Sequence, residues 1–335
     1  MRRNVTRVLV IAALVALIPT IAITWGNEGH MAINRAATQK IPADMPQFVK
    51  NGADHIAYMG PEPDRWREKL EATLKSAQEP EHFMDMELVE FMQALPKDRF
   101  QFIRDVYENR TQMQAAKADQ RDIDMMTPEK VGLQPYAAME AYDRLKVSFR
   151  EYRKAQKEGR STADAEAAVL HYAGWLGHYV GDAANPLHTT VKYNGWVGPN
   201  PNGYSTERDV HWKMEGLFVS RNLDQLPFAD LVAAPKKLDH PFEDYIAYMR
   251  ESQGKVERVY QIEKACGFEG AGTPESREFM RQQLGRGAQM LLNLWYTAWV
   301  DSAVEPPPYV PPKSEKPRSQ KSCSAAVPAE GAEKK

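Results

Sequence analysis

The stretch HYVGDAANPLH brings two histidines and an aspartate close together along the chain. His178 and Asp182 are four residues apart, so on a helix their side chains share one face, one turn apart. Pro186 ends that helix, and His188 follows just beyond its end. Imidazole and carboxylate groups are the usual non-thiolate ligands of zinc. This arrangement predicts that the three side chains approach one metal cluster from the same corner.

A second pair with the same spacing occurs in HWKME, where His211 and Glu215 are four residues apart on what we predict to be a second helix. For either pair alone, the alternative is a helix face stabilised by a cap or an ion pair. Two such pairs in this order, with a proline break between them, favour a metal site. A catalytic zinc site leaves a coordination position open for water, so the pattern also fits an enzyme.

Three further stretches carry residues of related chemistry. They hold His30 in WGNEGH, Asp64 and Arg67 in PDRWR, and His82, Phe83 and Asp85 in HFMD. Each stretch alone also fits a solvated loop or an ordinary core position. Arg67 is equally placed to form a surface ion pair with Glu68 or Glu71, and Phe83 is equally suited to the core.

The segments that must position these residues show the pattern of helices. Apolar residues recur at helical spacing, Thr273 and Pro274 form a start signal, and Gly159 forms a stop signal. No alternating run of strand length and no internal repeat stands out, and the stretch 194–204 has the composition of an inserted loop. The predicted helices cover residues 30–41, 96–117, 135–159, 162–185, 240–265 and 273–303. The predicted fold is all-α, with a single multi-helix domain over residues 25–305.

The N-terminal segment combines three arginines with an uncharged apolar run over residues 8–23. This pattern predicts a secretory signal peptide, residues 1–24, that is cut before Trp25. The alternative is an uncleaved anchor, because the run approaches the ~20 residues that span a bilayer. Cleavage removes three positive charges and no negative ones, so the formal net charge changes from −2 to −5. We therefore expect a mildly acidic protein that is secreted or periplasmic, and any attraction for phosphates must be local.

The opposite end has the composition of a disordered tail, since Pro, Ser, Lys and Glu dominate residues 306–335. The chain has two cysteines, Cys266 and Cys323, and the second lies in this tail. This arrangement provides no disulfide framework. Stability must come from the core and from bound metal.

Taken together, the motifs resemble those of the S-one/P-one nuclease family and of its structural relatives, the zinc-dependent phospholipases C. The matching pieces are WGNEGH, PDRWR, HFMD, HYVGDAANPLH and HWKME, which occur in the family's order between Trp25 and Glu215. The segment RGAQMLLNLW is also similar to that family's last helix. The resemblance covers most of the expected mature domain and implies an all-α fold of this type, built around three zinc ions (Zn2+).

The resemblance also implies which residues hold the metal. The first zinc would take Asp64, His82, His178 and Asp182, the second would take His188, His211 and Glu215, and the third would take Trp25 and His30, with Asp182 as a bridge. Trp25 would bind through its free α-amino nitrogen and its main-chain oxygen. A cut before Trp25 would therefore create a ligand that the precursor lacks.

For catalysis, the resemblance implies hydrolysis of a phosphodiester. A water shared by the first two zinc ions, with its pKa lowered toward ~7, would attack phosphorus. Asp64 would orient that water, and Arg67 would bind the phosphate as its charge develops. As in the nucleases, Phe83 would stack on a base and Asp85 would hydrogen-bond its edge.

The substrate class remains open on the motifs alone. Glu215, where the nucleases commonly have aspartate, is similar to the phospholipases, whereas the spacing from Trp25 to His30 is similar to the nucleases. The nucleases' Gly-Gly-Asn loop is missing, and NGWVGPNPNGYS stands in its place, with Trp196 or Tyr204 as candidates for the pocket wall.

We therefore expect a secreted zinc-dependent nuclease that hydrolyses single-stranded nucleic acid. The first alternative is a phospholipase C that acts on phospholipid head groups, and the second is a non-catalytic, zinc-stabilised binding protein. We expect a monomer with no stable protein partner.

Overall fold

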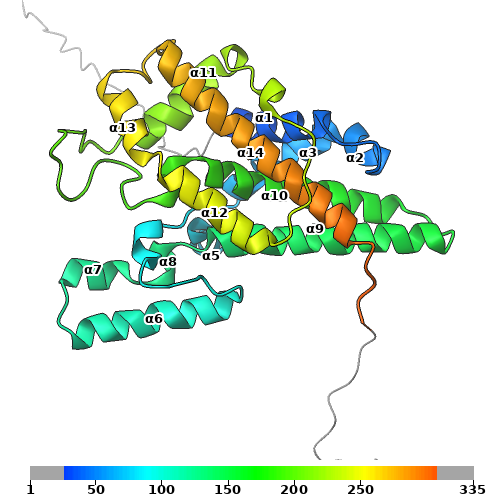
Figure 1. The fold of residues 1–335 in the computed structure, drawn as a ribbon, viewed down its shortest axis with the longest axis horizontal. Coiled ribbons are helices and arrows are strands. Elements are labelled where there is room, and N and C mark those ends of the chain that lie inside the picture. Colours follow the sequence, from blue (N-terminus) through cyan, green and yellow to red (C-terminus); the bar gives the residue numbers. More distant parts are fainter. Residues whose placement is uncertain (1–25, 308–335) are drawn as a thin grey trace, which may run out of the picture. The chain divides into compact units, whose positions relative to one another are not determined.

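The computed structural model describes residues 26–307 of the 335-residue chain (Figure 1). The expected signal peptide, Trp25 and most of the expected tail lie outside the described residues. Within residues 26–307 every regular element is a helix, apart from an isolated antiparallel bridge between Met84 and Gly132. The predicted all-α fold is therefore confirmed. None of the helices in this range is long and apolar enough to cross a bilayer.

The helices belong to one compact unit that ends at Ala303. The α-helices are α1 (Gly26–Gln39), α2 (Gln47–Asn51), α3 (Ala53–Met59), α4 (Glu62–Arg65), α5 (Ala72–Gln78), α6 (Arg99–Ala115), α7 (Gln120–Met125), α8 (Pro128–Val131), α9 (Gln134–Lys157), α10 (Ala163–Ala184), α11 (Ser220–Asn222), α12 (Pro241–Gln253), α13 (Val256–Lys264) and α14 (Pro274–Asp301). Short 3-10 helices are η1 (Glu79–His82), η2 (Met86–Val89), η3 (Pro186–Thr189), η5 (Leu223–Gln225) and η6 (Ala229–Leu231), and η4 (Trp212–Val219) is a π-helix.

Two of the predicted helices differ from the structure. The single helix expected over residues 240–265 is wrong, because the chain breaks between α12 and α13 at Gly254. Glycine is a weak helix former, and the N–H of Lys255 bonds back only three residues, to the oxygen of Ser252 at 2.9 Å. On either side of this tight turn, α12 and α13 both contact η3. The helix expected around HWKME is the π-helix η4, and π-helical turns often occur at functional sites.

Helix α10 is central to the unit and contacts α1, α3, α9, α12 and α14 (Figure 1). Its last nine residues, Leu176 to Ala184, are all buried. A helix end that is buried all round must be covered by other helices on every side. The polar side chains of this end, His178 and Asp182, are therefore enclosed within the protein.

Two glycines of α10, Gly177 and Gly181, let α1 approach closely, and Gly174 does the same for α3. A Cβ atom at Gly177 would lie 1.8 Å from Oδ1 of Asn34, and one at Gly181 would lie 2.9 Å from Nδ1 of His30. Asn34 uses this closeness to donate a hydrogen bond to the oxygen of Gly174 at 3.1 Å. The same closeness brings His30 of α1 against the buried end of α10.

Helix α14 packs against α10 and begins at the predicted cap. Thr273 and Ser276 form a capping box, in which the Thr273 side chain accepts from the Ser276 N–H at 3.1 Å. Trp295 is fully buried and donates its indole N–H to the oxygen of Ala173 in α10 at 3.2 Å. This bond satisfies the polar edge of a large side chain and ties α14 to the central helix.

Candidate metal centre

The end of α10 places three polar side chains at one buried corner. His178 Nε2 lies 3.2 Å from Asp182 Oδ2, and both residues are fully buried. The helix stops at Ala184, and Asn185 then caps η3 by accepting the N–H of Leu187 at 2.9 Å. This turn brings His188 Nδ1 to 3.6 Å from Asp182 Oδ1. The structure thus gathers the three residues that the proline break was expected to gather.

His82 and Asp64 approach the same corner from η1 and α4. His82 Nδ1 lies 2.9 Å from His178 Nε2, 3.2 Å from Asp182 Oδ2 and 3.6 Å from Asp64 Oδ1. Potential ligand atoms of His82, His178 and Asp182 all lie within 4.8 Å of one another, and those of His30, Asp64 and His178 do so as well. The four residues expected at the first zinc therefore share one site.

Main-chain hydrogen bonds hold the segment that carries His82 in place. His188 Nδ1 donates to the oxygen of His82 at 2.7 Å, and the N–H of Met84 donates to the oxygen of His188 at 3.0 Å. On the other side, the N–H of Asp85 donates to the oxygen of Val131 at 2.8 Å. The segment is fixed from both sides, which sets the positions of His82 and Asp85.

His30 completes the corner from α1. Its Nε2 lies 3.5 Å from Asp182 Oδ1, and its ring stacks on that of His178 with centroids 4.1 Å apart. His30 is fully buried. The other ligand expected at the third zinc, Trp25, lies outside the described residues, so this site is described only through His30 and Asp182.

A second group consists of His188, His211 and Glu215, whose potential ligand atoms also lie within 4.8 Å of one another. Glu215 Oε2 lies 2.8 Å from His211 Nε2, and Glu215 Oε1 lies 3.3 Å from His188 Nε2. Asn185 donates a hydrogen bond to Glu215 Oε1. Because His188 also approaches Asp182, the two groups form one continuous cluster.

Hydrogen bonds to carbonyl oxygens orient two of the imidazoles. The Nδ1 atom of His178 bonds to the oxygen of Gly60 at 2.9 Å, as that of His188 bonds to the oxygen of His82. A carbonyl oxygen only accepts hydrogen bonds, so the Nδ1 atom of each of these rings carries a proton. When the ring is neutral, its Nε2 atom therefore presents a lone pair to the cluster. His188 Nε2 faces His211 Nε2 at 3.1 Å, a contact that needs a shared proton or a cation. These residues fit zinc in donor type and in orientation.

The two buried carboxylates are held in the ionised form that metal binding requires. Burial alone would raise the pKa of Asp182, but His188 and His178 hold it well below its usual range. Burial would likewise raise the pKa of Glu215, but His211 and His188 lower it to about 2. Both groups are therefore negatively charged at neutral pH.

The histidines divide into two kinds. Burial lowers the pKa of His82 to about 4, so this ring is neutral at pH 7 and ready to donate a lone pair. Burial also disfavours the charged form of His188, but Asp182 and Glu215 outweigh it and raise the pKa to about 9. His188 therefore holds a proton that a metal ion would displace.

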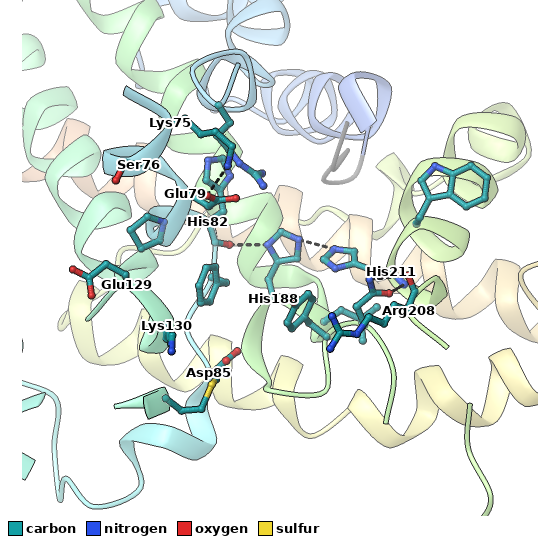
Figure 2. A pocket seen from close by; sticks show the side chains of 18 of the residues that line it. Lys75, Ser76, Glu79, His82, Asp85, Glu129, Lys130, His188, Arg208 and His211 are labelled. Atoms are coloured by element: carbon teal, nitrogen blue, oxygen red, sulfur yellow. Dashed lines mark hydrogen bonds and ion pairs between the residues drawn. The ribbon is translucent and has the colours of Figure 1, made fainter. Parts of the chain in front are cut away.

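A pocket of about 920 Å3 opens onto the cluster. His82, His188 and His211 lie next to one another along its wall (Figure 2). Phe83 and Asp85 also line it. Phe83 is half-buried, whereas Asp85 is only 4% exposed, and burial together with Glu87 raises the pKa of Asp85 well above its usual value.

Arg67 lies in the pocket wall and not in a surface ion pair. Its Nη1 donates to Asp64 Oδ1 at 3.1 Å, and no ion pair within residues 26–307 joins it to Glu68 or Glu71. Its Nε is buried without a hydrogen-bond partner in this range. Arg67 therefore combines a fixed position with an unused donor beside the pocket.

The expectation that Trp196 or Tyr204 lines the pocket is wrong. Neither residue is in the pocket wall formed by the described chain, and both pack on Tyr260 of α13, with ring centroids 5.2 and 5.8 Å away. Tyr193 and Trp212 line the pocket instead. In the sequence, only their positions next to Asn194 and His211 indicate that Tyr193 and Trp212 lie near the pocket.

Comparisons with known proteins give similarity to solved structures alone. No family model matches the sequence, and no curated protein matches it. Among solved structures, the alpha-toxin of Clostridium perfringens from avian strain SWCP is similar, with a TM-score of 0.39, and so is the alpha-toxin of Clostridium absonum, with a TM-score of 0.40. In each case the identity is 12%, and the alignment covers 82% of this chain and 63% of the toxin. The aligned region is thus less than two thirds of either toxin, and similarity at this level does not transfer their activity to this chain.

Proposed function

We propose that this protein is a zinc-dependent phosphodiesterase that hydrolyses single-stranded nucleic acid. The observation that carries the proposal is a continuous buried cluster of histidines and carboxylates that opens onto one pocket. The same pocket presents Arg67, Phe83 and Asp85, which suit a phosphate, a base face and a base edge. This combination is what hydrolysis of a nucleic acid strand requires.

The cluster offers ligands for more than one metal ion. One ion would be held by Asp64, His82, His178 and Asp182, a second by His188, His211 and Glu215, and a third by His30 and Asp182 together with Trp25. When bound, zinc lowers the pKa of a coordinated water and polarises a phosphoryl oxygen. We propose three ions because Asp182 directs one oxygen to His178 and the other toward His30.

Arg67 and Asp64 act as a unit on the phosphate and the attacking water. Asp64 Oδ1 accepts from Arg67 and lies 3.6 Å from His82 Nδ1, so the carboxylate stands between the arginine and the cluster. There it can orient a water and accept its proton. The planar guanidinium, with its buried Nε unused within the described residues, donates to the phosphate oxygens as negative charge develops.

Phe83 and Asp85 supply contacts to a base. A half-buried phenyl ring in a pocket wall offers a face for stacking, which is tolerant of base identity. Because the pKa of Asp85 is raised by burial and by Glu87, its carboxyl group remains protonated well above its usual range. A protonated carboxyl both donates and accepts, so it can pair with the edge of a base.

A phospholipase C is the second candidate, and two features favour it. Glu215 stands at the position where the nucleases commonly have aspartate. Leu70 is 85% exposed, between Lys69 and Ala72 of the pocket wall. An exposed leucine at a pocket mouth suits an apolar lipid surface better than a polyanionic strand.

Metal analysis followed by parallel assays tests the proposal. The purified protein should contain close to three zinc ions per chain, and it should hydrolyse single-stranded DNA or RNA but not phosphatidylcholine. Chelation should abolish the activity, and zinc should restore it. His178→Ala should be inactive, whereas His240→Ala, at an exposed histidine before α12, should match the wild type. Hydrolysis of the lipid alone, or a zinc content of one or less, would contradict the nuclease proposal.

N-terminal sequencing of the secreted protein tests the third ion separately. A chain that begins with Trp25 supplies an α-amino group and a main-chain oxygen as ligands. A chain that begins elsewhere removes the third site and should contain at most two zinc ions.

A further inference from the structure

Beyond His211, the pocket wall carries two aromatic side chains and an arginine. Tyr193 and Trp212 line the pocket and are 52% and 45% exposed. The ring of Tyr193 lies 6.1 Å from that of His211, centroid to centroid. Arg208 lines the same pocket, near His211 (Figure 2). It takes part in no ion pair within residues 26–307.

The main chain that carries Tyr193 is firmly anchored. The hydroxyl of Tyr260, a fully buried residue, donates to the oxygen of Lys192 at 2.5 Å and accepts the N–H of Gly195 at 3.0 Å. Asn194 donates its side-chain amide to the oxygen of Arg208 at 2.9 Å. The main chain that carries the exposed ring of Tyr193 is thus already held in place. The binding of a ligand that stacks on this ring therefore costs little main-chain entropy.

Trp212 is supported in a different way. A Cβ atom added at Gly216 would lie 2.8 Å from Cδ1 and 3.1 Å from Nε1 of Trp212. The indole therefore rests against the bare main chain of η4, in contact that any side chain at Gly216 would disturb. One side of the indole thus lies against the helix while nearly half of the residue remains exposed.

The rings of Tyr193 and Trp212 are exposed although other aromatic rings nearby pack into the core. In the same loop, Trp196 and Tyr204 pack against each other with ring centroids 4.7 Å apart, and Tyr204 is only 6% exposed. The loop packs two aromatic rings against the core and presents a third, that of Tyr193, to the pocket. A pair of supported, exposed aromatic rings beside a guanidinium is the combination that binds a base and its phosphate.

We propose that Tyr193, Trp212 and Arg208 form a second binding site, which takes the nucleobase and phosphate on the far side of the scissile bond from Phe83. The proposal rests on the proposed nuclease function. Figure 2 shows Asp85, beside Phe83 in the sequence motif, and Arg208 on opposite sides of His188. The scissile phosphate then lies between two stacked bases, so the smallest good substrate is a dinucleotide with both bases present.

A comparison of substrates with and without each base tests this site. The substrates are the dinucleotide d(TpT) and its two analogues that lack either the 5′ or the 3′ base. For the wild type, loss of either base should lower kcat/KM by about 5- to 150-fold, the range expected for one stacked base. The double variant Tyr193→Ala/Trp212→Ala should lose a similar factor on d(TpT). Removal of one particular base should then have no further effect, whereas removal of the other should still be costly.

Phe83→Ala should give the complementary pattern, with sensitivity retained only to the base that the double variant ignores. Tyr107→Ala is the matched control, since Tyr107 is 44% exposed on α6 and does not line the pocket. It should behave as the wild type. Arg208→Ala should reduce the salt dependence of kcat/KM on an oligonucleotide, because one phosphate contact is lost.

Two outcomes would overturn the second site while leaving the nuclease function intact. One is a double variant with wild-type kcat/KM on d(TpT), and the other is a double variant that remains equally sensitive to the loss of either base. A wild-type protein that hydrolyses neither d(TpT) nor longer single strands would overturn both proposals. Zinc content and circular dichroism of each variant establish that the cluster and the fold are retained.

Discussion

Hydroxyl groups on α12 bind the main chain of the α10 segment that carries the candidate metal ligands His178 and Asp182. The three bonds run from Ser252 to the oxygen of Ala183, from Tyr248 to that of Val180 and from Tyr245 to that of Tyr179, over 2.6, 3.0 and 2.9 Å. The donors are buried, and the acceptors flank Asp182 in the last turns of α10. These bonds fix the rotation of α10, and hence the directions of His178 and Asp182.

Ser252→Ala is the sharpest test of this arrangement. Carbonyl groups in the last turn of a helix lack intrahelical partners, and the N–H of Leu187, four residues after Ala183, bonds instead to Asn185. Loss of the Ser252 hydroxyl leaves a buried acceptor unsatisfied, at a cost of about 1–3 kcal/mol in the free energy of unfolding. Zinc binding must then restore the loosened turn, so the zinc affinity should fall by at most the same free energy, about 5- to 150-fold.

Two measurements and one control decide the matter. Urea unfolding of the zinc-depleted protein gives the loss in stability, and competition with a chromophoric chelator gives the zinc affinity. The control is Ser148→Ala, which removes another buried serine hydroxyl, one that bonds within its own helix to the oxygen of Arg144 at 2.9 Å. This control should bind zinc like the wild type. If Ser252→Ala binds zinc as tightly as the wild type and is no less stable than the control, the reasoning is refuted.

Three further predictions address packing and protonation. Gly177→Ala should lower the free energy of unfolding by at least ~1–3 kcal/mol in urea titrations, because its Cβ would lie 1.8 Å from Oδ1 of Asn34. Burial raises the pKa of Asp85, so wild-type stability should fall as the pH rises through that pKa; Asp85→Asn should lack this loss in unfolding curves measured across pH. The pKa of His188 is raised from 6.5 to about 9, so its ion pairs, including that with Glu215, stabilise the folded protein. This stabilisation should be fully present below pH 6.5 and should be lost as the pH rises through 9. Zinc binding at pH 7 should accordingly release a proton from His188, and calorimetry that finds no dependence on buffer ionisation enthalpy would contradict this.

The part of the cluster that follows from local spacing could be predicted from the sequence. His178, Asp182 and His188 meet because one helix turn and one proline break determine their geometry, and His211 and Glu215 meet for a similar local reason. These relations need no knowledge of the rest of the chain. They survive even though the second pair lies at a π-helix and not at an α-helix.

The site residues that depend on contacts between distant parts of the chain could be predicted only from the family resemblance, or not at all. His30 reaches Asp182 because Gly177 and Gly181 let α1 approach α10, and no local pattern in α1 reports that closeness. Trp196 and Tyr204 were misplaced for the same reason. Their partner is Tyr260, more than fifty residues further along the chain, and no local pattern in the loop indicates that contact.

The charges around the candidate metal centre are layered in a way that fits the proposed polyanionic substrate, although the chain has a formal net charge of −2. Asp64, Asp182 and Glu215 lie around the cluster, next to the C-terminal end of α10, whose helix dipole also favours cations. Arg67 and Arg208 lie further out, in the pocket wall. A metal ion is therefore attracted to the inner layer and a phosphate to the outer layer, and bound metal would add positive charge where the inner layer is negative. Under the proposed nuclease function, attraction for the substrate strand would then be confined to the pocket.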